Sequence, residues 1–247
     1  IGFIKNLISS SVYPKRFCFI LIFLSFSNWK FFDEAFPKSL FGSCFVQTYQ
    51  EKLKIVIASF NEGKLKEFKA LFHDSNFHLI SLKDFTSDDI EETGLSYEEN
   101  AMLKAKKASE ITNFPSLGDD SGLEVKLLNN DPGLFSARYS GKNASDEKNI
   151  SKLLKKTEGL KNKAAKFIST LAFYDPRKKI ELFSFGELAG EISIGKKGTR
   201  GFGYDPIFKL KNSNKTLAEV SFEERMKISH RSISTRKMIT HLSEIYK

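Results

Sequence analysis

Two adjacent carboxylates in the middle of the chain are the residues best suited to chemistry. Asp119 and Asp120 are followed by Ser121 and a glycine, and they come shortly after the apolar run 114–117. This pattern is typical of a strand that ends by presenting acids to a cleft, so we expect both carboxylates at such an edge. Paired carboxylates can hold a divalent cation and take a proton from water. The sequence therefore predicts an acidic, cation-binding site here.

A second polar segment lies near residue 60. The β-branched apolar run 53–59 predicts a strand, and an amphipathic helix follows it. The loop between them gathers backbone N–H groups at the positive end of the helix dipole, where Ser59, Asn61 and Lys64 add polar side chains. A phosphate group fits such a loop. A solvated helix cap with a surface lysine remains open as the alternative.

The elements that must position these residues predict a mixed α/β domain. The runs 166–174 and 179–188 are the clearest strands, and the turn between them predicts an antiparallel hairpin, which excludes a purely parallel sheet. The other expected elements are strands at 78–82 and 123–127, an acidic turn at 88–94, helices at 96–111, 145–157, 221–227 and 230–246, and a glycine- and lysine-rich loop at 195–203. We predict a mixed sheet with two lobes around a cleft.

The charge balance and the cysteines limit the class of protein. The net charge of +9 comes from 39 basic and 30 acidic residues that are interspersed, which fits an anionic partner, either a polynucleotide or a small phosphate. Cys18 and Cys44 are the two cysteines of the sequence, so the chain after residue 50 can form neither a disulfide framework nor a cysteine-ligated zinc site. This usage favours a reducing cytoplasm.

The first fifty residues read differently from the rest. Lys15 and Arg16 precede the apolar stretch 17–26, which is too short to span a bilayer and is followed by no small-residue cleavage site. We expect residues 1–50 to be an N-terminal extension outside the fold and residues 51–247 to be the domain. A targeting or membrane-surface segment is the alternative, and a mis-assigned start would explain why the first methionine is Met102.

Six motifs occur in a familiar order. They are Ser59-x-Asn61-x-x-Lys64-x-x-Glu67, Glu91-Glu92-Thr93-Gly94, Asp119-Asp120-Ser121-Gly122-Leu123, Ser136-Ala137-Arg138-Tyr139-Ser140-Gly141, Gly201-Phe202-Gly203-Tyr204-Asp205-Pro206 and Ser229-His230-Arg231. Any one could arise by chance, but six in order are specific. Over about residues 53–245 the chain resembles the inosine triphosphate pyrophosphatase (Ham1/RdgB-like) family.

The resemblance implies an activity and a set of roles. The family hydrolyses ITP, dITP and XTP to the monophosphate and pyrophosphate with Mg²⁺, usually as a homodimer, on an elongated mixed-sheet α/β fold with a cleft between two lobes. By this resemblance Asp120 accepts the proton of the attacking water, and Glu91 and Asp120 hold the metal. Lys64 is the second catalytic residue, because it would neutralise charge on the triphosphate.

The resemblance also implies the substrate-binding residues. Those expected at the phosphates are Ser59, Phe60, Asn61, Glu62, Gly63, Lys64 and Ser121, and those expected around the base are Phe202, Gly203, Tyr204, Asp205, Arg225, His230 and Arg231. Phe202 is the expected stacking face. The family often has a lysine where this chain has Arg225, and a glycine where it has Arg200, so the geometry at these two positions is expected to differ.

Three other functions compete with this one. A nucleic-acid-binding protein would use the positive charge, but the basic residues are scattered and form no recognisable binding motif. A pyrophosphatase for modified pyrimidines does not account for the base-pocket residues of the resemblance. An inactive nucleotide sensor would not need Lys64, Glu91 and Asp120. We therefore expect a cytoplasmic enzyme acting on a small nucleotide, with no nucleic-acid partner and no membrane contact of the main domain.

Overall fold

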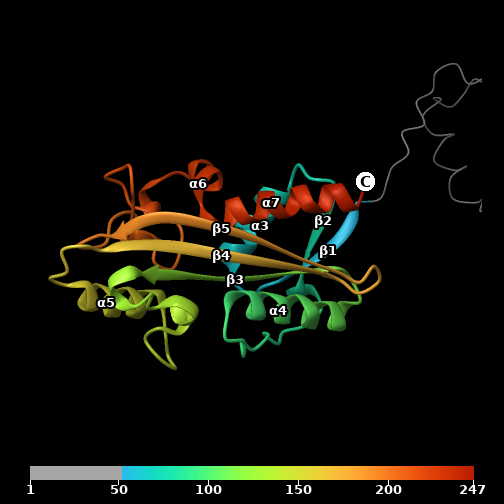
Figure 1. Cartoon of the computed structure of the whole chain (residues 1–247), viewed down its shortest axis with the longest axis horizontal. Helices are drawn as coiled ribbons and strands as arrows, with labels where there is room; N and C mark the ends of the chain where they lie inside the picture. The colour runs from blue at the N-terminus through green and yellow to red at the C-terminus, as the bar shows by residue number, and fades with distance from the viewer. Residues whose placement is uncertain (1–51) are drawn as a thin grey trace, which may run out of the picture. The chain divides into compact units, whose positions relative to one another are not determined.

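The computed structural model describes residues 52–247, so the expected extension at residues 1–50 lies outside the described part (Figure 1). A six-stranded sheet has the order β2-β1-β3-β4-β5-β6. Its strands are β1 (Leu53–Ala58), β2 (Phe77–Ser81), β3 (Ser116–Val125), β4 (Ala164–Asp175), β5 (Ile180–Ile192) and β6 (Phe208–Leu210). β1 runs parallel to β2 and β3, whereas β3 to β6 pair antiparallel. The predicted mixed sheet and the β4–β5 hairpin are confirmed.

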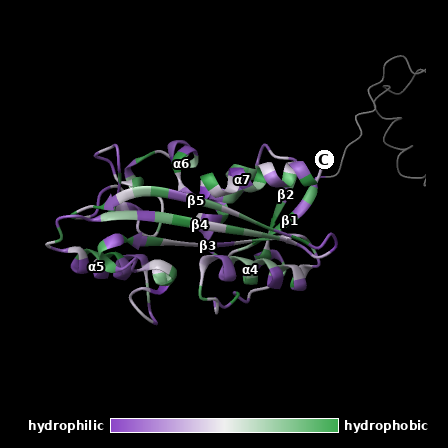
Figure 2. Ribbon diagram, viewed as in Figure 1, coloured by the Kyte–Doolittle hydropathy of each residue, from purple (hydrophilic) through white to green (hydrophobic). Residues whose placement is uncertain are grey.

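Helices cover both faces of the sheet. They are α3 (Glu62–Phe72), α4 (Tyr97–Thr112), α5 (Asp146–Thr157), α6 (Phe222–Ile228) and α7 (His230–Ile245), joined by short 3₁₀ turns. In Figure 1, α4 and α5 lie on one side of the long strands, and α6 and α7 lie on the other. Figure 2 shows both hydrophobic and hydrophilic positions on these helices, as expected of helices with one packed face. Within residues 52–247, none of them is long and apolar enough to cross a membrane.

Two main hydrophobic clusters lie along the same long strands. One joins α3 and α7 to the sheet around Phe68, Leu117 and Leu171, and the other lies under α5 around Leu123 and Phe167. Leu117 and Leu123 both belong to β3, so this strand runs from one cluster into the other. The two clusters account for the predicted two lobes, and the segment of β3 between them carries the acids.

The acids lie within a strand and not at its end, which corrects one expectation. β3 is continuous from Ser116 to Val125 because β4 pairs with it along its full length. Neighbouring residues of a strand point to opposite faces, so Asp119 and Asp120 cannot act as a simple pair. β1 ends opposite Gly118, where Ala58 is its last partner. The edge of β3 is therefore not covered by β1 from Asp119 onward, and the α3 loop begins there.

The close approach of α4 to β3 depends on small residues. A Cβ atom on Gly118 would lie 2.0 Å from the carbonyl oxygen of Ala101. Ala101, Ala105 and Ala108 are fully buried in the packed face of α4. These small residues let α4 approach β3 closely, which brings the polar residues of α4 against the acids of β3.

Candidate active site

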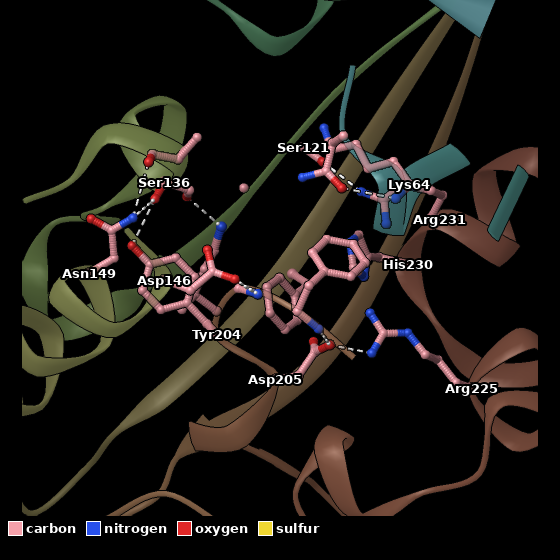
Figure 3. A pocket seen from close by; sticks show the side chains of 17 residues that line it. Lys64, Ser121, Ser136, Asp146, Asn149, Tyr204, Asp205, Arg225, His230 and Arg231 are labelled. Carbon is pink, nitrogen blue, oxygen red and sulfur yellow. Dashed lines mark hydrogen bonds and ion pairs between the residues drawn. The ribbon is translucent and has the colours of Figure 1, made fainter. Parts of the chain in front are cut away.

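Most of the predicted substrate-binding residues line one cavity of about 120 Å³ (Figure 3). Those that line it are Asn61, Lys64, Ser121, Phe202, Gly203, Tyr204, Asp205, Arg225, His230 and Arg231. In Figure 3, Lys64, Ser121 and Arg231 lie together at one side of the cavity, and Asp146, Asn149 and Ser136 lie at the other. The fold therefore brings separate segments of the chain into a single site.

The loop before α3 is a capped helix start with a largely buried lysine. Asn61 is the N-cap, and its Oδ1 accepts a hydrogen bond from the Lys64 amide at 3.1 Å. The Lys64 side chain is only 17% exposed, and its Nζ lies 2.7 Å from Asp119 Oδ2. Burial lowers the pKa of Lys64, and the carboxylate of Asp119 limits the fall. The alternative of a surface lysine is thus excluded, whereas the helix cap is real.

The remaining residues predicted in this loop do not line the cavity. Ser59 is buried and accepts a hydrogen bond from the Asn61 amide at 3.3 Å. Glu62 is exposed and pairs with Lys83, so its side chain is directed elsewhere. Phe60 packs against a hydrophobic cluster of β1 and α4. These residues shape the loop, and their side chains are not placed to touch a ligand in the cavity.

Phe202 closes the cavity against the start of α3. A Cβ atom on Gly63 would lie 2.4 Å from the Phe202 ring, so the ring rests directly on this glycine. The ring also faces the guanidinium carbons of Arg225 at 5.1 Å and Arg231 at 5.8 Å. Ligand pockets usually enclose roughly 300–1,000 Å³, so this cavity is small for a whole nucleotide.

Asp119 is a buried, ionised anchor on one face of the sheet. Its Oδ2 pairs with Lys64, and its Oδ1 accepts a hydrogen bond from Ser169 Oγ at 3.1 Å. Arg231 Nη2 lies 3.5 Å from the same carboxylate. Burial alone would raise the pKa of Asp119, but Lys64 and Arg231 hold it far below its usual value. Asp119 therefore stays charged and orients these two cations.

Asp120 has the opposite character on the other face. Asn100 Nδ2 donates to its Oδ2 at 3.2 Å, and Lys104 Nζ lies 3.4 Å from its Oδ1. Burial raises the pKa of Asp120 to about 6, Lys104 limits the rise, and Glu92 adds to it. Two adjacent carboxyl groups with pKa values shifted in opposite directions indicate different roles. Asp120 has the pKa of a general base, although its side chain does not line the described cavity.

Glu92 and Lys104 complete the acidic cluster. The Lys104 ammonium pairs with Glu92 and Asp120 and donates to the Asp119 carbonyl at 3.1 Å. Arg138 Nη1 lies 2.6 Å from Glu92 Oε2. Burial alone would raise the pKa of Glu92, but Lys104 and Arg138 lower it to about 2.

Of the two predicted metal ligands, Asp120 is buried in this cluster and Glu91 is exposed, and the assignment itself stays a prediction. Glu91 is exposed, whereas its neighbour Glu92 faces Lys104 and Asp120. Lys104, which is 8% exposed, was not predicted from the sequence. A signal was present, because residue 104 falls on the same helical face as Ala101 and Ala108. A charged residue in a packed stripe requires a buried partner.

The side of the cavity away from Asp120 is held by a buried ionic chain. Glu67 Oε1 lies 2.5 Å from Arg225 Nε, and Glu67 Oε2 lies 2.6 Å from Arg231 Nη1. Arg225 also pairs with Asp205, whose Oδ2 accepts a hydrogen bond from the Phe202 amide at 2.9 Å. Burial raises the pKa of Asp205 to about 6 against the opposing effect of Arg225. This chain fixes both arginines, and a role for Glu67 was not predicted.

His230 is a neutral ring stacked in the cavity wall. It lies 4.8 Å from the Phe167 ring centroid at an interplanar angle of 13°. Burial holds the pKa of His230 well below its usual value. His230 Nδ1 and Arg231 Nε are buried without a hydrogen-bond partner among the described residues. Buried polar atoms normally have partners, so these two depart from the usual pattern.

The residues around Asp120 suit a hard divalent cation. Glu92 and Asp120 both direct carboxylate oxygens at one cation, the ammonium of Lys104, and such oxygens are the ligands that Mg²⁺ prefers. No group of three or more His, Cys, Asp or Glu side chains within residues 52–247 is arranged to hold an ion by itself. Mg²⁺ keeps several waters and is commonly bound by one or two carboxylates together with substrate phosphates.

Buried cations, a carboxyl group with a raised pKa and an aromatic-lined cavity on a mixed sheet are typical of an enzyme that acts on a phosphate-containing substrate. The sequence pattern of the Ham1 family matches residues 55–241. A dITP/XTP pyrophosphatase of Staphylococcus aureus (strain MW2) is 46% identical over 179 residues, which are 72% of this chain and 90% of that protein. The chain belongs to the Ham1 family.

Solved structures agree with this assignment. A HAM1 protein from Coxiella burnetii has a TM-score of 0.72 and 40% identity, covering 78% of this chain and 99% of that one. The Staphylococcus aureus Ham1 protein has a TM-score of 0.70 and 42% identity, covering 77% of this chain and 98% of that one. The predicted family and fold are confirmed.

Proposed function

We propose that this protein hydrolyses ITP, dITP and XTP to the nucleoside monophosphate and pyrophosphate with Mg²⁺, which removes these nucleotides from the pool. The name dITP/XTP pyrophosphatase of the Staphylococcus aureus relative supports the substrate class. The single observation that carries the proposal is the pair of carboxyl groups at the uncovered edge of β3. Asp119 holds Lys64 beside the cavity, and Asp120 has a pKa of about 6 on the opposite face.

The residues divide the reaction between them. Asp120 takes a proton from a water molecule, whose oxygen then forms a bond to the α-phosphorus as the bond to the bridging oxygen breaks and pyrophosphate leaves. Lys64, oriented by Asp119, neutralises charge on the phosphates. Glu92 and Asp120 are the residues that would hold Mg²⁺, which supplies further neutralisation of the triphosphate. Lys104 keeps the Asp120 carboxyl in place and limits the rise in its pKa that burial causes.

Selection of the base depends on the unpartnered atoms of the cavity. Hypoxanthine and xanthine carry a 6-oxo acceptor, whereas adenine carries a 6-amino donor. Arg231 Nε is a buried donor without a partner among the described residues, so a 6-oxo base would satisfy it and a 6-amino base would not. Phe202 supplies the aromatic face for stacking and is fixed at its backbone by Asp205.

The finer features of the proposal concern assembly, location and extent. We propose that the protein is a homodimer that acts in the cytoplasm, as the resemblance of its motifs implies. Residues 51–247 are proposed as the catalytic domain, and the family match to residues 55–241 falls within these bounds. The proposed substrate is a small nucleotide, with no nucleic-acid partner and no membrane contact of the main domain.

Product analysis tests the proposal. The protein is incubated with ITP, XTP, GTP and ATP, with and without Mg²⁺, and pyrophosphate is measured. We expect strong preference for ITP and XTP, dependence on the metal, and loss of turnover in Asp120→Asn. Equal rates on ATP would defeat the proposed base selection, and release of orthophosphate alone would defeat the proposed bond.

A further inference from the structure

The loop that carries Phe202 has little stiffness of its own. Gly198, Gly201 and Gly203 all have positive φ, at 76°, 78° and 58°, within a stretch of six residues that also contains Phe202. Glycine loses more conformational entropy on folding than other residues, so such a loop keeps one shape only when contacts from elsewhere hold it. The position of Phe202 therefore depends on what holds its backbone.

Two adjacent amides of this loop are held by two aspartates on different elements. The Phe202 amide donates to Asp205 Oδ2 at 2.9 Å, within the loop itself. The Gly203 amide donates to Asp146 Oδ2 at 2.7 Å, and Asp146 lies 57 residues away at the first position of α5. Both aspartates line the cavity, and both are labelled in Figure 3. Together they hold the two peptide groups that flank the Phe202 Cα atom.

The Asp146 carboxylate lies on a helix whose position is held by other contacts, and the helix does not use this carboxylate as its N-cap. Ser145, and not Asp146, caps α5 by accepting from the Lys148 amide at 3.3 Å. Asn149, one turn further on, is 3% exposed and donates to the carbonyl oxygens of Ser136 and Ala137. A hydrogen bond from an amide to a carboxylate is stronger than one between neutral groups. The helix thus offers a fixed, charged acceptor to a flexible loop.

We propose that Asp146 is a positioning residue for base recognition, which acts by holding the Gly203 amide and thereby the backbone of Phe202. The inference rests on the function proposed above and extends it to a residue outside the six motifs. Because Asp146 holds backbone and not the ring, the Phe202 side chain can leave Gly63 to admit a base while its backbone stays in place. Loss of this anchor affects discrimination between bases more than the chemistry at Asp120.

The matched control lies next to Asp146. Glu147 is in the same helical turn, and its carboxylate lies 2.7 Å from Lys196 Nζ in the same glycine-rich segment. This pair joins two exposed side chains, with 48% and 66% exposure, and such pairs contribute little. Glu147→Gln therefore removes one charge from the start of α5 without releasing a backbone amide, whereas Asp146→Ala removes a charge and the acceptor. Asp146→Asn removes the charge but keeps an acceptor oxygen.

Two measurements on the full chain test the proposal. The first is the ratio of kcat/KM for ITP to kcat/KM for ATP. In Asp146→Ala we expect this ratio to fall about tenfold, the size of a lost hydrogen bond to a charged group, mainly through KM for ITP. Asp146→Asn recovers most of the ratio, and Glu147→Gln keeps the wild-type ratio. The second is hydrogen exchange of the segment 201–207 without nucleotide, which we expect to be faster in Asp146→Ala alone.

Several outcomes overturn the inference. An unchanged ITP-to-ATP ratio in Asp146→Ala sinks it, whether or not hydrogen exchange becomes faster. Equal losses on ITP and ATP with a lowered melting temperature show a structural role only, and so does an Asp146→Asn variant as impaired as Asp146→Ala. A wild-type protein that releases no pyrophosphate from ITP overturns the proposed function and this inference with it. If the wild-type protein releases pyrophosphate from ITP and Asp146→Ala keeps the wild-type ITP-to-ATP ratio, only this inference is overturned.

Discussion

Replacing Glu67 with glutamine is expected to destabilise the domain strongly, although the two side chains are nearly identical in shape. Glu67 is 2% exposed and is shared by Arg225 Nε at 2.5 Å and Arg231 Nη1 at 2.6 Å. Glutamine offers one acceptor oxygen to one arginine and turns an NH₂ donor toward the other. One buried guanidinium then faces a donor instead of a carboxylate.

The magnitude follows from the partners that remain. Removing one member of a buried ion pair costs about 3–5 kcal/mol. Arg225 keeps Asp205, and Arg231 keeps Asp119 at 3.5 Å, so we place the loss at the lower end, about 3 kcal/mol. For a domain of this size each kcal/mol shifts the melting temperature by about 2–4 °C, which gives a fall of about 6–12 °C.

Urea and thermal unfolding followed by circular dichroism measure this loss at pH 7. Glu110→Gln is the matched control, because Glu110 is 62% exposed and pairs only with Lys107 three residues away on the surface of α4. We expect this control to remain within about 0.5 kcal/mol of wild type. If Glu67→Gln unfolds as late as Glu110→Gln, the buried ionic chain does not hold the cavity, and the reasoning from its geometry is wrong.

Four further predictions concern the acidic cluster. Glu92→Gln should raise the concentration of Mn²⁺ needed for half-saturation of the protein by at least about tenfold, whereas Glu91→Gln should bind Mn²⁺ like wild type. Electron paramagnetic resonance without nucleotide measures this binding. Equal effects of the two substitutions would support Glu91 as the ligand. Because Asp120 has a pKa of about 6 and must be deprotonated to accept a proton, kcat/KM for ITP should fall as pH decreases through about 6. Lys104→Met removes a cation that lowers this pKa, so the midpoint of the profile should move to higher pH; an unmoved or lower midpoint contradicts the assignment. Since the folded pKa of Asp120 exceeds its ordinary value of 3.8, the native state binds the proton more tightly and loses stability as pH rises from about 4 to 6. In metal-free buffer Asp120→Asn should therefore be more stable than wild type by about 3 kcal/mol at pH 7 and by much less at pH 4.5. An equal difference at both pH values in urea unfolding would refute this.

Local signals were enough to predict most of the elements. The hairpin of β4 and β5 followed from two alternating runs and a turn, and the start of α4 followed from Ser96, whose Oγ accepts from the Glu99 amide at 3.1 Å. These features depend on residues close in sequence, so a single sequence reveals them. The order of the motifs then added the family and its mixed-sheet fold.

Tertiary contacts explain what the sequence could not predict. The segment around Asp119 and Asp120 looked like a strand end because glycine and acids are rare in strands, but pairing with β4 along its length overrides that preference. Which of Glu91 and Glu92 faces inward depends on the path of a loop that has no periodicity. Asp146 and Glu67 act through partners 57 and 158 residues away, a distance in sequence that no local pattern spans.

The path of the water oxygen tests the central claim most directly. Hydrolysis of ITP by the wild-type protein in water enriched with heavy oxygen, followed by mass spectrometry of the products, shows which phosphorus is attacked. We predict one labelled oxygen in IMP and none in pyrophosphate, because Asp120 directs the water to the α-phosphorus. Label in pyrophosphate, or formation of inosine diphosphate with labelled orthophosphate, would contradict the assignment of this site.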